Sequence, residues 1–156
     1  MPRPRIAPLA VAVLALPSCS VAPGSGGPDL HEGQVRHAIR VSGGLRGRIL
    51  SIDARATRDN RHGFAAGQPV PYLTITYRVE PDDGGAPAAR GTLAPYATRD
   101  GLRYEATLPD LPPGPHRLVL AVRPPTVNGF GRHTDAATGV APWWGPFEVA
   151  FRLPGL

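Results

Sequence analysis

The side chains best placed to do chemistry lie in one loop near the C-terminus. Gly131 to Asp135 reads Gly-Arg-His-Thr-Asp and presents a single imidazole, His133, in a polar turn. Both tryptophans of the chain, Trp143 and Trp144, follow it. Indole rings bury large apolar areas, and a tryptophan pair is more often packing than a ligand platform. We therefore predict that the two indoles anchor the loop that carries His133.

The common enzyme patterns are missing from this sequence. It contains no nucleophile elbow, no phosphate-cradling glycine loop, no paired-cysteine metal site and no His-Glu-x-x-His helix. Asp82 and Asp83 stand in a glycine-rich hairpin turn, while Asp53 and Asp59 fall on a strand face and in a turn. We therefore expect a protein that is not an enzyme.

The composition favours a turn-rich β fold. The 156 residues include 20 prolines and 19 glycines, with 42% hydrophobic residues, and no long segment has helical periodicity. All 17 basic residues are arginines, and the formal net charge is +5. The arginines are scattered singly, without a basic run or a basic helix, which argues against nucleic acid as the main partner.

The N-terminal region has the pattern of an export signal. Arg3 and Arg5 precede an apolar segment, residues 6–16, which is too short to span a bilayer as a mature helix. Residues 1–18 are therefore expected to be a signal peptide. They end before Cys19, the single cysteine, which predicts lipidation at Cys19 and a protein anchored in the cell envelope. Ordinary cleavage that leaves an unpaired thiol is the alternative.

Residues 19–44 are expected to form a flexible tether, because their first part is rich in Gly, Ser and Pro. His31, Glu32 and His37 fall in this tether, where we expect them to be solvated. Residues 45–156 are expected to form the folded domain.

Period-two alternation of apolar and polar residues predicts six or seven short strands in that domain. They are expected to form an antiparallel two-sheet sandwich of immunoglobulin type. The predicted strands cover residues 50–57, 71–79, 90–96, 102–108, 116–122 and 147–153.

Two tracts of the sequence resemble one protein family. The segment from Gly131 to Trp144 and the segment from Gly63 to Tyr77 are similar to tracts of the periplasmic iron-transport proteins, and the similarity covers roughly residues 45–153. The resemblance implies an immunoglobulin-like sandwich that binds iron or copper in the periplasm. It also implies a homodimer that works beside an inner-membrane metal permease.

The resemblance also implies a set of metal ligands, only part of which is present here. The family uses an early His-x-Glu pair, a thioether, a carboxylate and two further imidazoles. The last imidazole matches His133 and the carboxylate matches Asp100. Tyr96 stands at the thioether position and Arg103 at the other imidazole position, while the His-x-Glu pair falls at about Ile49 and Ser51.

Arginine is protonated and donates only, so Arg103 cannot ligate a cation. We predict that Arg103 pairs with Asp100 and that the metal site of the family is degenerate in this chain.

Three functions stay open at this stage. The chain is a metal carrier or permease accessory that uses His133, Asp100 and Tyr96, with His62 as a further candidate ligand. Alternatively, it binds anions through Arg103, Arg99 and Arg132, joined by Arg55. In the third case it is an envelope protein-interaction module that has lost metal binding.

Overall fold

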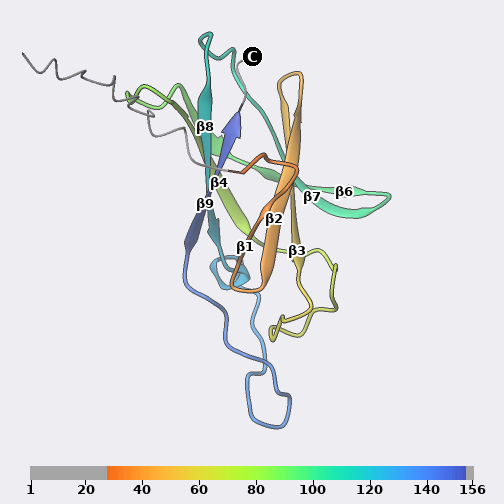
Figure 1. The fold of residues 1–156 in the computed structure, drawn as a ribbon. Helices are drawn as coiled ribbons and strands as arrows, with labels where there is room; N and C mark the ends of the chain where they lie inside the picture. The colour runs from red at the N-terminus through yellow and green to blue at the C-terminus, as the bar shows by residue number, and fades with distance from the viewer. Residues whose placement is uncertain (1–27, 154–156) are drawn as a thin grey trace, which may run out of the picture.

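The structure is a computed structural model that describes residues 28–153 of the chain, and it is an antiparallel β-sandwich (Figure 1). One sheet has five strands in the order β1-β2-β3-β7-β6, and the other has four in the order β5-β4-β8-β9. A single turn of 3₁₀ helix, Pro125–Asn128, follows β8. The all-β, immunoglobulin-like class predicted from the sequence is confirmed. The strands are β1 Gln34–Arg36, β2 Ile39–Arg46, β3 Ile49–Ala56, β4 Thr74–Pro81, β5 Ala89–Thr92, β6 Ala94–Thr98, β7 Gly101–Thr107, β8 His116–Arg123 and β9 Phe147–Leu153.

The core forms where the inward residues of the two sheets meet. In β3, for example, Leu50 and Ile52 are fully buried, while Ser51 and Asp53 face outward and are half-buried. The same alternation holds in β4, where Ile75 and Val79 point inward. Burying such an aliphatic side chain contributes about 1.5–3 kcal/mol, which is why the alternating pattern fixes the faces of the strands.

The folded domain starts earlier than we predicted. Residues up to 44 were expected to be a tether, but β1 and most of β2 lie within that segment and pair antiparallel with each other and with β3. Ile39 and Val41 are fully buried. Gly43 is required here, because a Cβ at this position would lie 2.1 Å from the carbonyl oxygen of Ser51.

A second correction concerns residues 90–96, which we expected to form one strand. The chain changes sheets in the middle of this segment, so that β5 pairs with β4 in one sheet and β6 pairs with β7 in the other. Leu93 lies at the crossing point and is buried. Its N–H donates to the carbonyl of Ile75, which holds the crossing against β4.

The predicted signal peptide and the lipidation residue Cys19 lie outside the described residues. Among residues 28–153, no helix is long and apolar enough to cross a membrane.

Candidate functional site

The loop that carries His133 extends from the end of the sandwich below β8 and β9 (Figure 1). The tryptophan pair closes its base. Trp144 is buried and Trp143 half-buried, and both pack against the core. The two rings meet edge to face at 5.3 Å between centroids, and Trp143 Nε1 donates to the carbonyl of Phe130 at 3.3 Å. The predicted anchoring role of the two indoles is confirmed. His133 itself is exposed.

Arg132, which we considered for anion binding, lies against two aromatic rings. Its guanidinium lies 4.0 Å from the ring centroid of Trp143 and 4.9 Å from that of Phe64. Burial lowers the pKa of Arg132. A cation beside aromatic rings stabilises the packing, so Arg132 helps to fix the loop base, and its Nη1 has no hydrogen-bond partner among the described residues.

His62, the further candidate ligand, is also a packing residue. Its ring is stacked on Trp143 at 5.8 Å and meets the edge of Trp144 at 4.8 Å. The side chain is buried, and burial is the first cause that lowers the pKa of His62, with the nearby charge of Arg132 adding to the effect. His62 therefore holds the 131–144 loop against the 60–64 turn and is not presented to a ligand.

The position that the resemblance assigns to a metal-binding imidazole lies on the outer face of the five-stranded sheet. Arg103 is on β7, and its Nε lies 3.4 Å from Asp53 Oδ1 on β3. Arg55 Nη2 approaches the same carboxylate oxygen at 3.3 Å. The side chain of Asp53 is only 19% exposed. Two guanidinium groups thus approach the Asp53 carboxylate, Arg55 through a hydrogen bond and Arg103 through charge attraction without one.

The predicted pairing of Arg103 with Asp100 is therefore wrong. Asp100 lies in the turn between β6 and β7, is exposed, and contributes its backbone carbonyl to a 3.3 Å hydrogen bond from Arg55 Nη2. The strand register places Arg103 beside Tyr96 on β6 and, on its other side, within reach of β3. Asp53 is the acid on that side, so the strand register makes Asp53 the ion-pair partner of Arg103 in place of Asp100 in the turn.

The remaining predicted site residues do not converge within one chain. Tyr96 is 53% exposed on the edge strand β6, and Arg99 is exposed in the turn next to Asp100. The β6–β7 ribbon reaches out to one side of the sandwich, while the His133 loop extends from its end (Figure 1). In the part of the chain that the structure describes, no group of three or more His, Cys, Asp or Glu side chains could hold a metal ion.

A polar groove of about 550 Å³ runs over this sheet face, and it includes residues that the sequence reasoning missed. Glu105 on β7 accepts a 2.7 Å hydrogen bond from Ser51 Oγ on β3. The His31 ring lies over Gly44, and a Cβ added at Gly44 would lie 3.0 Å from Cε1 of His31. The alternation of β7 could have placed Glu105 on the face of Arg103, but nothing in the sequence signals where His31 folds back. The groove is lined by His31, Ser42, Gly43, Gly44, Leu45, Arg46, Ile49, Ser51, Asp53, Arg103 and Glu105.

The positions of Ile49 and Ser51 bear on the metal site, because the resemblance aligns these two residues with the early His-x-Glu pair. Both line this groove together with Arg103. The fold therefore brings three of the aligned positions to one place, although the residues that stand there have changed.

The comparison with known sequences decides the family. Residues 48–154 match the family described as Fe2+ transport protein. The chain belongs to this family. UPF0423 proteins of Brucella abortus and Brucella suis are 40% identical over 107 residues, which is 67% of this chain and 58% of theirs. The chain therefore spans less than two thirds of the length of these curated relatives.

Solved structures with the same fold include copper-bound proteins. A copper-bound variant of FetP from uropathogenic Escherichia coli has a TM-score of 0.72 and 28% identity, covering 83% of this chain and 97% of that one. The copper-reconstituted P19 protein of Campylobacter jejuni has a TM-score of 0.70 and 28% identity, covering 83% of this chain and 98% of that one. Both relatives have thus been observed with copper.

Proposed function

We propose that this chain is a periplasmic, non-enzymatic accessory protein of iron or other divalent-metal transport whose inherited metal position is closed by an arginine. Membership of the Fe2+ transport family and the copper-bound relatives support the transport role. The closure of the metal position is inferred from the contact of Arg103 with Asp53. Arg103 stands where the family resemblance puts an imidazole.

The chemistry of the groove residues does not fit a divalent cation at that position. A guanidinium has no lone pair to donate and repels a cation. The carboxylate of Asp53 already faces two positive groups, and the Ser51 hydroxyl donates to Glu105. The carboxylate oxygens that face these partners would have to leave them before they could coordinate a metal ion.

His133 is the family imidazole that stays accessible. It is exposed at the end of an anchored loop, and its backbone carbonyl accepts a hydrogen bond from Thr138 Oγ1. With Asp100 and Tyr96 on another part of the surface, a single chain offers His133 as an isolated imidazole, which binds divalent ions weakly. We propose that the chain meets the metal ion transiently as cargo.

The proposed partners are a second copy of the chain, an inner-membrane metal permease and the membrane itself, through a lipid on Cys19. All five residues of β6 are exposed at the edge of its sheet, and Tyr96 is among them. An exposed edge strand leaves backbone groups available for pairing with another chain. This observation supports association through the β6–β7 ribbon.

The alternative function, anion binding through Arg103, Arg99 and Arg132, has less support. Arg103 is paired with Asp53, and Arg132 lies against the rings of Phe64 and Trp143. Of the three arginines, Arg99 is the exposed one. A single exposed arginine does not make a selective anion site.

Titration calorimetry with copper tests the proposal. We expect the wild-type chain to give a weak heat that disappears in His133→Ala and persists in the control His31→Ala, which removes an exposed imidazole in the groove. Tight binding of one copper ion per chain that survives His133→Ala would contradict the proposal. Such a result would mean that the groove itself holds the metal.

A further inference from the structure

The outer face of the four-stranded sheet is strongly basic. Its outward positions carry five arginines and two glutamates, a formal excess of three positive charges. Residues 28–153 as a whole contain fifteen arginines and twelve acids, because Arg3 and Arg5 precede them, so this one face accounts for the entire excess. We call it the arginine face. Its charged residues are Arg78, Glu80, Arg90, Arg117, Arg123, Glu148 and Arg152.

The strand register sets arginines directly opposite each other on this face. Arg78 on β4 is the cross-strand partner of Arg90 on β5, and Arg117 on β8 is the partner of Arg152 on β9. Like charges directly opposite in a sheet are destabilising. Arg78 and Arg117 offset part of this repulsion through their glutamate partners, and an anionic partner that lies across Arg90 would offset more of it.

The acids on the arginine face neutralise only part of it. Arg78 contacts Glu148 at 2.6 Å and Glu80 at 2.6 Å, and Arg117 contacts Glu80 at 3.0 Å. Within residues 28–153, Arg90 and Arg123 have no salt bridge or side-chain hydrogen bond, and both are exposed. These two guanidinium groups are available to a partner.

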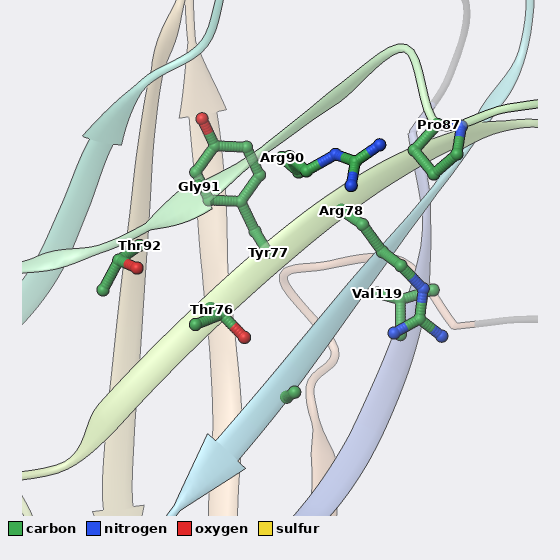
Figure 2. A pocket seen from close by; sticks show the side chains of 9 residues that line it. Thr76, Tyr77, Arg78, Pro87, Arg90, Gly91, Thr92 and Val119 are labelled. Carbon is green, nitrogen blue, oxygen red and sulfur yellow. The ribbon is translucent and has the colours of Figure 1, made fainter.

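A groove of about 360 Å³ lies beside Arg90 (Figure 2). Thr76 and Thr92 stand on one side of it and Arg90 and Arg78 on the other, with Val119 beside Arg78. Arg78 already donates to Glu80 and Glu148, so Arg90 and the two threonine hydroxyls are the groove's available donors. A guanidinium and hydroxyl donors beside partly apolar surface suit a phosphate ester, because the phosphate accepts charge-assisted hydrogen bonds. The groove can therefore receive a phospholipid headgroup.

The chain enters the domain next to this face. The carbonyl of Pro28 accepts a hydrogen bond from Arg152 N at 3.3 Å, and Asp29 forms a bridge with Arg152 on β9. Cys19, the proposed lipid anchor, precedes Pro28 by nine residues. Nine residues span at most about 30 Å, so a membrane that holds Cys19 is within reach of the arginine face.

From the charge, the groove and the entry point of the chain, we propose that the arginine face docks on anionic phospholipid headgroups, with Arg90 and Arg123 as its main contacts. Docking would hold the domain against the bilayer in one orientation, with the four-stranded sheet toward the lipid. The charge attraction acts over about 10 Å at ordinary ionic strength, so it strengthens only once the face has approached the headgroups.

Vesicle sedimentation tests the proposal with the full chain carrying Cys19→Ser, so that no acyl chain at this residue contributes. We expect binding to vesicles of phosphatidylglycerol and phosphatidylcholine to exceed binding to phosphatidylcholine alone, and to weaken with salt. Each arginine near an anionic surface changes the partition constant about fivefold. The double variant Arg90→Gln with Arg123→Gln should therefore bind about 25-fold more weakly.

The matched control is Arg58→Gln with Arg99→Gln, which removes the same charge from exposed turns outside the arginine face. We expect vesicle binding by this control to weaken by less than about threefold. Equal losses in both double variants, or equal binding to both vesicle types, would overturn the proposal. Displacement by inorganic phosphate at constant ionic strength would overturn it in favour of a small-anion site. A dimer that dissociates in the Arg90 and Arg123 variant without vesicles would overturn it in favour of an interface between two copies.

Discussion

Replacing Asp53 by asparagine tests the assignment of Asp53 as the partner of Arg103. The carboxylate lies 3.4 Å from Arg103 and 3.3 Å from Arg55, and its side chain is 19% exposed while the two arginines are 38% and 31% exposed. An exposed ion pair contributes about 0.2–1 kcal/mol. Asp53→Asn removes two such partly buried pairs, so its free energy of unfolding should fall by about 1–2 kcal/mol. This corresponds to a fall in Tm of roughly 3–8 °C.

Thermal unfolding followed by circular dichroism measures this loss against the matched control Asp110→Asn. Asp110 is 90% exposed and pairs with Arg48 at 3.1 Å, so its loss should stay below about 0.5 kcal/mol. A second readout concerns sulfate. Without the carboxylate, the guanidinium groups of Arg103 and Arg55 have no acid between them, and sulfate should raise the Tm of Asp53→Asn more than that of the wild type. Equal destabilisation in the two variants, with no extra effect of sulfate, would refute the assignment.

Three further predictions concern the scaffold of the site. Tyr104→Phe should cost about 1–3 kcal/mol in urea unfolding, because the buried hydroxyl donates to Val70 O at 2.8 Å and accepts from Leu73 N–H at 3.1 Å; an unchanged midpoint would contradict this. Because the pKa of His62 is lowered in the folded state, stability should be complete above the ordinary value of about 6.5 and fall as the pH drops below it. His62→Phe should flatten that dependence, and an unaltered pH profile of Tm would exclude His62 as its source. Gly43→Ala should destabilise the sandwich by more than about 2 kcal/mol, since its Cβ would meet the Ser51 carbonyl at 2.1 Å, whereas Gly145→Ala, with nothing within 4 Å, should not.

Most strands could be predicted from local pattern alone, because alternation along one strand reports which face is buried. The segment of β9 from Phe147 to Leu153 was predicted with the bounds observed. The first two strands were missed, since Gly43 and Gly44 in β2 resemble a linker when the strand they pack against is unknown. The sheet change at Leu93 was missed for a similar reason, because the alternation continues through it while the pairing partners change.

The candidate site could be predicted only as a set of positions. The sequence indicated that Arg103 stands where an imidazole would be needed, but its partner depends on the register of β3 against β7, which no local pattern records. Asp53 is fifty positions away in sequence, whereas Asp100 is three away, and proximity along the chain favoured the wrong acid. The stacking of Arg132 and His62 on the tryptophans depends on two loops meeting at the end of the sandwich. Single-sequence reasoning has no access to such a contact.

Copper titration of Arg103→His tests most directly whether this arginine closes the inherited metal position. The substitution removes the positive charge, releases Asp53 from one of its two partners and supplies an imidazole. We predict that copper binding strengthens at least about tenfold, equivalent to about 1.4 kcal/mol, relative to both the wild type and the exposed control Arg99→His. A wild-type chain that already binds copper as tightly as Arg103→His would contradict the account.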